Sequence, residues 1–227
     1  MTGAGRTDTG PVRTANEDHW HIDAGRGLFI VADGMGGHQA GEVAAHLAVA
    51  EVVADLVASA GAAFAWPLGR DASQSRAANR IGHALRRAND AVYAAGVSDP
   101  ALVGMGTTLT VLLVDEGQAV IGSVGDSRAY LVRGAGIELL THDDTWLASV
   151  LGSDGARDPA RAEVLTRAME PGDILVLATD GLHNVVDDTS IGQLVRGYRP
   201  DAAAQGLLDA ALARGTTDNV TVVVVHA

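Results

Sequence analysis

Four aspartates lie where stretches typical of buried strands begin or end. They are Asp33 after residues 28–32, Asp126 after Gln118–Val124, Asp180 after residues 174–179, and Asp218 shortly before Val220–His226. Taken singly, each is an ordinary turn or cap residue. If their strand ends meet at one end of the fold, however, the carboxylates repel one another unless a cation lies between them. All-oxygen ligands favour Mg²⁺ or Mn²⁺, and two such ions form a hydrolytic site.

Glycines follow Asp33 almost directly. The segment Asp33-Gly34-Met35-Gly36-Gly37-His38 joins the apolar run to a helical stretch that begins near Ala40. Glycine lets a backbone carbonyl approach an ion or a phosphate closely. Because glycine has no side chain to pack in a sheet, we expect the strand to end before this segment. A tight strand-to-helix turn with Asp33 as helix cap is the alternative interpretation.

An arginine in the polar N-terminal segment adds a group that can bind phosphate. Arg13 lies five residues before Asp18, and a guanidinium can hold phosphate oxygens with two hydrogen bonds. Beside a cluster of carboxylates and metal ions, Arg13 suits the hydrolysis of a phosphomonoester. On its own, it is typical of an ordinary surface residue or ion pair.

The composition limits the class of protein and its partners. The chain has 227 residues and a formal net charge of −12; all 16 basic residues are arginine, and there is no cysteine. This charge argues against nucleic acid or an anionic membrane as a partner, and the lack of thiols excludes a cysteine nucleophile and thiolate metal sites. Neither a membrane-spanning run nor a signal-peptide core is present in the sequence. We expect a cytoplasmic protein that acts as a monomer.

Hydrophobic patterns indicate the elements that must position these residues. We expect helices at 40–59, at about 73–95 and from Pro200 onward. After Gly106 the pattern changes to short apolar runs, at 107–114, Gln118–Val124, 129–133 and 137–140. The gaps between these runs are too short for helices, so neighbouring strands must be antiparallel. Their continuous apolar character implies burial on both faces, which two stacked sheets with helices outside would provide.

Two further segments are interpreted from their polarity. The second long helix carries Arg76, Arg80, His83, Arg87 and Asp90 along one side. We interpret that side as a solvated face. Residues 145–167 are of mixed character and predict a short helix near 146–151 followed by a polar loop.

Six short motifs follow one another along the chain. They are R-x-x-N-E-D at 13–18, V-A-D-G-M-G-G-H at 31–38, G-T-T at 106–108, V-G-D-S-R-A-Y at 124–130, T-D-G-L at 179–182 and D-N-V-T at 218–221. In this order they resemble the bacterial metal-dependent protein phosphatases (the PPM family, type 2C). The resemblance implies an α+β fold, an α-β-β-α sandwich of two stacked antiparallel sheets, with two or three Mn²⁺ or Mg²⁺ ions in a cleft. It also implies hydrolysis of phosphoserine and phosphothreonine in proteins by a metal-bridging hydroxide.

The resemblance assigns metal ligands residue by residue. Asp33 matches the ligand that bridges both core metals, and the Gly34 carbonyl completes the first of these sites. Asp180 and Asp218 match ligands of the second metal. Asp126 matches the ligand of a third, weaker metal in bacterial members.

Four other residues match positions beside these ions. Glu17 and Asp18 match an acidic pair that contacts the centre directly or through water; we count Glu17 with the metal ligands and Asp18 with the catalytic residues. Arg13 matches the phosphate-binding arginine. His38 matches the proposed general acid, although three residues separate it from Asp33-Gly34.

The chain departs from the family pattern in one region. After Leu140-Thr141 it has His142-Asp143-Asp144, where relatives usually carry D-H-S and a longer flap, and a strand hairpin usual before Pro171 is missing. In the family, the flap borders the cleft and shapes substrate access. We therefore predict a single phosphatase domain, residues 1–227, with a shortened flap around 141–168.

Two alternative functions stay open at this point. The same fold could act as a pseudophosphatase, a regulatory binding module, or as a phosphatase for a small phosphorylated metabolite. The intact Asp33, Asp180 and Asp218 argue against the pseudophosphatase. The partners that we expect are phosphoproteins, either substrates of a serine/threonine kinase or the kinase itself, with no nucleic acid and no membrane.

Overall fold

The computed structural model describes residues 1–36, 40–61, 63–67, 69–143, 151–152 and 163–227. The strands are β1 (Thr2–Asp8), β2 (Asp18–Asp23), β3 (Leu28–Met35), β4 (Gly106–Thr107), β5 (Leu109–Asp115), β6 (Gln118–Val124), β7 (Arg128–Arg133), β8 (Gly136–Leu139), β9 (Glu163–Ala168), β10 (Ile174–Ala178) and β11 (Val220–His226). The helices are α1 (Ala40–Ala58), α2 (Arg76–Ser98), η1 (Pro100–Leu102), α3 (Asp180–His183), α4 (Asp188–Val195) and α5 (Pro200–Ala213).

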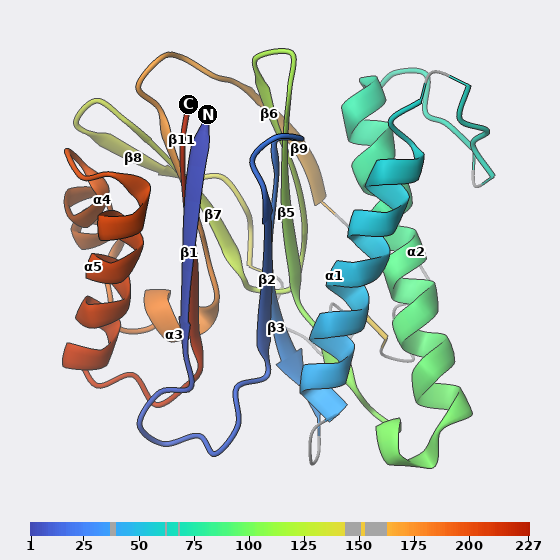
Figure 1. Cartoon of the computed structure of the whole chain (residues 1–227), viewed down its shortest axis with the longest axis horizontal. Helices are drawn as coiled ribbons and strands as arrows, with labels where there is room; N and C mark the ends of the chain where they lie inside the picture. Colours follow the sequence, from blue (N-terminus) through green and yellow to red (C-terminus); the bar gives the residue numbers. More distant parts are fainter. Residues whose placement is uncertain (37–39, 62, 68, 144–150, 153–162) are drawn as a thin grey trace.

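These strands form two antiparallel sheets stacked face to face (Figure 1). One sheet has the order β1-β11-β10-β7-β8, and the other has the order β2-β3-β5-β6-β9, with β4 paired to β3. Fully buried side chains fill the space between the sheets, among them Phe29, Leu112, Leu177 and Val223. Because the central strands are covered on both faces, they appear in the sequence as nearly unbroken apolar runs.

Helices cover the outer face of each sheet. Helices α1 and α2 lie against the sheet that contains β3, and α4 and α5 lie against the sheet that contains β11 (Figure 1). Helix α2 begins where the Ser75 hydroxyl accepts a hydrogen bond from the Ala78 N–H at 3.0 Å, a standard N-cap. The predicted α-β-β-α sandwich of the α+β class is therefore confirmed.

Strand β3 is longer than the sequence pattern predicts. We expected it to end before the glycines, but it continues to Met35, because Gly34 and Met35 pair with Thr107 and Gly106 of β4. A strand of two residues leaves no periodic signal in the sequence. As a consequence, Asp33 lies within a hydrogen-bonded strand and not in a turn.

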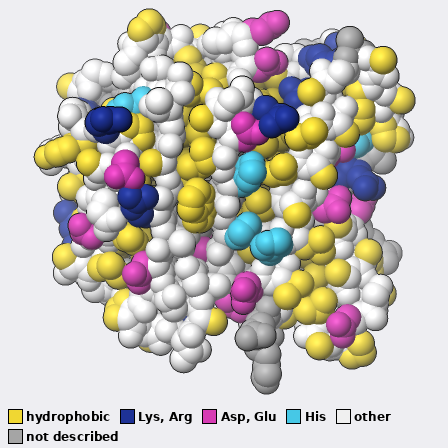
Figure 2. Space-filling model, viewed as in Figure 1, with side chains coloured by type: hydrophobic (Ala, Val, Ile, Leu, Met, Phe, Trp, Pro, Cys, Tyr) yellow, Lys and Arg dark blue, Asp and Glu magenta, His cyan; other side chains and the backbone are white. Residues whose placement is uncertain are grey.

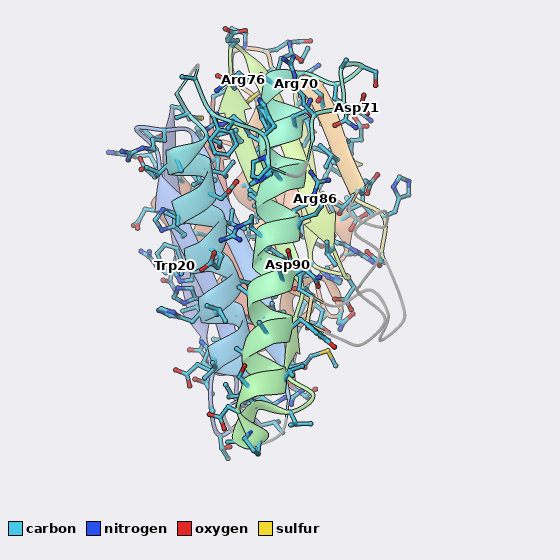
Figure 3. All side chains as sticks on the ribbon, turned by 90° about the vertical axis from the view of Figure 1, so that its right-hand side faces the viewer. Trp20, Arg70, Asp71, Arg76, Arg86 and Asp90 are labelled. Carbon is cyan, nitrogen blue, oxygen red and sulfur yellow. The ribbon has the colours of Figure 1, made fainter. Side chains whose placement is uncertain are left out.

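The charged side of α2 is only in part the solvated face that we expected: Arg87 and Asp90, the latter labelled in Figure 3, are exposed. His83 is buried, with its Nδ1 2.9 Å from the Asp55 carboxylate of α1. Arg76 and Arg80 donate hydrogen bonds to backbone carbonyls at the C-terminal end of α1. These carbonyls have no partner within their own helix and carry partial negative charge. The prediction was wrong for Arg76, Arg80 and His83, because these residues hold the two helices together.

Two strands lie where none was predicted. Strand β1 pairs with β11 from Thr2–His226 to Asp8–Val220, so the two ends of the chain lie side by side (Figure 1). Strand β9 pairs with β6 in place of the last part of the predicted polar loop. Most of the helix predicted near 146–151 lies outside the described residues. Within the described part of the chain, no helix is both long and apolar enough to span a membrane.

Candidate metal centre

The start of β2 and the end of β3 bring two carboxylates together. Asp18 lies directly opposite Asp33 in the register of these strands. It is 8% exposed, and its Oδ2 accepts a hydrogen bond from the Thr179 hydroxyl at 2.9 Å. Burial raises the pKa of Asp18 to about 7, and the nearby Asp180 and Asp218 add to the rise. Burial also raises the pKa of Asp33 well above its usual value, and the four neighbouring aspartates add to this.

Gly34 lies where three segments of backbone cross. A Cβ atom at this position would be 2.1 Å from the Gly41 carbonyl oxygen of α1 and 2.6 Å from the Glu17 carbonyl oxygen. The Gly34 N–H donates to that Glu17 carbonyl at 3.2 Å. Only glycine permits this approach. The close crossing places Glu17, whose pKa is raised by burial, beside the end of β3.

The Asp180 carboxylate is placed by the junction of β10 and α3. Asp180 is the first residue of α3, and its Oδ2 accepts a hydrogen bond from the Asn184 side chain at 3.0 Å. Its Oδ1 is buried and has no hydrogen-bond partner. Burial raises the pKa of Asp180, and the nearby Asp218 and Asp126 carboxylates raise it further.

Asp218 lies two residues before β11, the strand that pairs with β10. Its Oδ2 lies 2.6 Å from Nη2 of Arg13, which comes from the loop between β1 and β2. The Arg13 side chain is 51% exposed. The hydrogen bond and charge of Asp218 raise the pKa of Arg13, and Asp33 and Glu17 contribute in the same direction. The arginine thus lies among the predicted ligands and is open to solvent.

Asp126 occupies the turn between β6 and β7, where the chain crosses from one sheet to the other. Burial raises the pKa of its carboxyl group. The Asp126 carbonyl lies 3.1 Å from Nε2 of His183, the last residue of α3. Burial lowers the pKa of His183 to about 4, so the ring is neutral at pH 7 and Nε2 carries the hydrogen of this bond.

The structure therefore gathers the predicted carboxylates around Asp33. Asp18, Asp126, Asp180 and Asp218 all lie close enough to raise its pKa. Their donor set consists of oxygens alone, and one buried oxygen each of Asp18 and Asp180 has no hydrogen-bond partner. Both features fit a hard cation such as Mn²⁺ or Mg²⁺.

In the described residues, no three acidic or histidine side chains form a ready-made ion cage. Each of three carboxylates contacts another side chain: Asp218 contacts Arg13, Asp180 contacts Asn184 and Asp18 contacts Thr179. His38, the predicted general acid, lies outside the described residues.

Asn219 is a residue of this centre that the sequence analysis did not single out. Its side chain is 5% exposed, accepts from the Glu17 N–H at 2.8 Å and donates to the carbonyls of Thr9 and Ala15 at 2.8 and 2.9 Å. It thereby fixes the loop that carries Arg13. Its signal was its place directly after Asp218 in the D-N-V-T motif, which gives no role because its partners are far away in the sequence.

Comparison with known proteins relates nearly the whole chain to metal-dependent protein phosphatases. Residues 11–214 match the family model for protein phosphatase 2C. The chain is 34% identical to the serine/threonine protein phosphatase PstP of Mycobacterium tuberculosis, over 97% of this chain and 44% of that protein. It is 32% identical to the protein phosphatase PhpP of Streptococcus pneumoniae, over 96% of this chain and 94% of that protein.

The solved structures agree with the sequence relatives. The catalytic domain of PstP, in complex with two manganese ions, matches with a TM-score of 0.82 and 32% identity, over 98% of this chain and 96% of that one. The chain thus spans less than half of full-length PstP and nearly all of PhpP. With a family model that covers most of its length, this chain belongs to the protein phosphatase 2C family.

Proposed function

We propose that this chain hydrolyses phosphoserine and phosphothreonine in proteins with the help of Mn²⁺ or Mg²⁺. The observation that carries the proposal is the gathering of Asp18, Asp126, Asp180 and Asp218 around Asp33 at one end of two packed sheets. Its homologues PstP and PhpP are protein phosphatases, and the catalytic domain of PstP was solved with two manganese ions.

Each carboxylate has a proposed role toward the ions. Asp33 would bridge two of them, the Gly34 carbonyl would complete the first, Asp180 and Asp218 would hold the second, and Asp126 would hold a third, weaker ion. Glu17 would contact the centre directly or through water. When bound, the ions supply an activated water and neutralise charge that develops on the phosphoryl group.

The remaining steps belong to the protein's own side chains. Arg13, 51% exposed at the edge of the carboxylate cluster, leaves Asp218 and binds the phosphate oxygens of the substrate. Asp18 lies opposite Asp33, is 8% exposed and accepts a hydrogen bond from Thr179, and it is proposed as the catalytic carboxylate beside the ions. His38 is proposed as the general acid for the leaving serine or threonine oxygen.

The proposal extends to the domain, partners and location of the protein. Residues 1–227 form a single phosphatase domain with a shortened flap around 141–168. Its substrates are phosphoproteins, including those of a serine/threonine kinase or the kinase itself, and it acts as a monomer in the cytoplasm. The net charge of −12 supports a protein that binds neither nucleic acid nor an anionic membrane.

A direct assay is release of phosphate from a phosphothreonine peptide, with a phosphorylated metabolite as competing substrate. We expect turnover with Mn²⁺ and none with EDTA, and loss of turnover in Asp33→Asn. Asp115→Asn is the matched control, because Asp115 also ends a strand but lies at the opposite end of the sandwich. Full turnover in EDTA would exclude the metal mechanism, and turnover on the metabolite alone would exclude the protein substrate.

A further inference from the structure

Three buried hydroxyl groups lie next to the backbone of the predicted ligands Asp33 and Asp126. Thr107, Thr108 and Ser127 are 0%, 7% and 1% exposed. None of them has a role in the chemistry proposed above. A hydroxyl that is removed from water must be hydrogen-bonded to be tolerated, so their partners show what they hold in place.

Two of these hydroxyls fix the backbone of Asp33. The Asp33 N–H donates to Thr108 Oγ1 at 3.0 Å. The Asp33 carbonyl accepts from the Thr108 N–H at 2.9 Å and from Thr107 Oγ1 at 2.9 Å. Both polar groups of the Asp33 backbone are therefore held by one dipeptide. The regular pairing of β3 with β5 ends at Val31 and Thr110. Beyond that point, these hydrogen bonds hold β3 in place.

The same hydroxyl of Thr108 reaches the turn that carries Asp126. Thr108 Oγ1 lies 2.8 Å from Ser127 Oγ, and Ser127 is the residue directly after Asp126. The carbonyl of Ser127 accepts a further hydrogen bond from Thr110 Oγ1 at 2.9 Å. An unbroken series of hydrogen bonds thus runs from the Asp33 N–H through Thr108 to Ser127.

We infer that Thr108 and Ser127 are positioning residues that set the place of Asp33 relative to Asp126 and so determine the affinity of the centre for its ions. This inference rests on the proposed function, because it concerns the same ions. The carboxylates of Asp33 and Asp126 repel each other, so their backbones must be held for both to face one centre. Residues that orient metal ligands in this way typically change metal affinity about 10- to 100-fold when they are removed.

The Asp126 turn is also held from its other side. His183 donates to the Asp126 carbonyl at 3.1 Å and belongs to α3, which begins with Asp180. The turn is therefore connected by hydrogen bonds to the segments that carry Asp33 and Asp180. A turn fixed on both sides is prepared for an ion and does not need to be ordered by it.

The chain contains a matched control for the Thr108–Ser127 contact. Ser123 Oγ lies 3.1 Å from Thr110 Oγ1, and both residues are buried. Ser123 bonds to neither the Asp33 backbone nor the Thr108 hydroxyl, and it reaches the Asp126 turn only through Thr110, whose own hydrogen bond to the Ser127 carbonyl does not need Ser123. Ser123→Ala therefore removes a buried hydroxyl from the same core and leaves the positioning contact intact.

The test is calorimetric titration of metal-free protein with MnCl₂, which does not depend on turnover. We expect Thr108→Val and Ser127→Ala to weaken Mn²⁺ binding about 10- to 100-fold. Thr108→Ser, which keeps the hydroxyl, and Ser123→Ala should stay within about twofold of the wild type. Because the two residues act as one unit, the double variant should be little weaker than either single variant.

Hydrogen exchange gives a local readout in the absence of metal. In Thr108→Val, the Asp33 amide should exchange about tenfold faster or more, because its acceptor is gone. Ser127→Ala decides the question if Thr108→Val does not fold. Equal Mn²⁺ affinity in Ser127→Ala and Ser123→Ala, or additive losses in the double variant, would overturn the inference. A wild type that binds no Mn²⁺ would instead overturn the ion centre of the proposed function, and this inference with it.

Discussion

Asp18 shows how strongly a single residue can be shifted by its surroundings. Its carboxyl group is almost fully buried, close to other acids, and its pKa rises to about 7. The folded protein therefore binds a proton at Asp18 that the unfolded chain releases near pH 4. Such a group stabilises the fold at low pH, and this contribution is lost as the pH rises from about 4 to about 7. Asp33 acts in the same direction.

The first prediction concerns this pH dependence in metal-free protein. The Tm in EDTA should fall by several degrees between pH 5 and pH 8, since about 1 kcal/mol corresponds to about 2–4 °C in a domain of this size. Asp18→Asn should show a clearly smaller fall, because asparagine does not titrate and still accepts from Thr179. Thermal melts across this range test it. An equal fall in both proteins would assign the effect to other groups.

A second prediction concerns Arg13. If its guanidinium holds phosphate equally in the ground state and the transition state, Arg13→Ala should raise KM severalfold and change kcat little. Arg13→Lys should be intermediate, because lysine keeps the charge but not the paired donors. Steady-state kinetics with a phosphothreonine peptide measure this. Arg26→Ala is the control, since Arg26 is an exposed arginine paired with Asp23 in the turn between β2 and β3. An unchanged KM in Arg13→Ala would make Arg13 an ordinary surface residue.

Some residues of the candidate site can be identified from the sequence, and others cannot. The strand-end aspartates could be found because each follows or precedes an apolar run, and Arg13 because of its place in a motif. Asn219, Thr108 and His183 could not be given roles, because each acts on backbone far away in the chain. Hydrogen bonds of that kind leave no trace in local spacing.

At the scale of elements, the metal centre depends on how closely β3 approaches the start of α1. Gly34 permits this approach, and β4 extends the pairing of β3 past Asp33. The apolar runs predicted the central strands of both sheets and their antiparallel pairing, but not β1 or β9. They did not predict the continuation of β3 through glycine, since close backbone contact and not side-chain packing holds it there.

Gly34 provides a third prediction. In Gly34→Ala, the new Cβ would meet backbone oxygens of Gly41 and Glu17 that cannot move aside. The free energy of unfolding should fall by about 1–3 kcal/mol, as in other overpacked sites. Gly82→Ala is the control: Gly82 lies inside α2 with no atom close to its absent Cβ, and alanine there should stabilise by about 0.5–1 kcal/mol. Urea unfolding of both variants would decide. A Gly34→Ala variant as stable as the wild type would mean that the crossing can relax.

At the scale of the whole molecule, the negative charge works against an acidic substrate. Arginine and acidic side chains are interspersed over the face seen in Figure 2, and histidine side chains gather near its middle. A net charge of −12 repels phosphoproteins at long range, but salt screens this beyond about 8–10 Å. In the proposed function, affinity for the substrate therefore comes from the ions and Arg13.

The fourth prediction is that bound ions raise the Tm, because they neutralise the repulsion among the clustered carboxylates. An ion that binds only the folded protein stabilises it by about 2.7 kcal/mol at a hundredfold excess over its dissociation constant. This corresponds to a rise in Tm of about 5–10 °C with Mn²⁺ relative to EDTA. The rise should vanish in Asp33→Asn and persist in Asp115→Asn. If Asp33→Asn shows the full rise, the ion binds elsewhere and the pseudophosphatase becomes the better account.

The central claim is that strand ends distant in the sequence hold two ions between them. Crystals grown with MnCl₂ and measured at the manganese absorption edge test it most directly, because anomalous scattering locates the metal without reference to activity. We predict two strong peaks, both in contact with Asp33, one of them also with Asp180 and Asp218, and Arg13 turned away from Asp218. A map with no anomalous peak among Asp33, Asp180 and Asp218 would contradict the account.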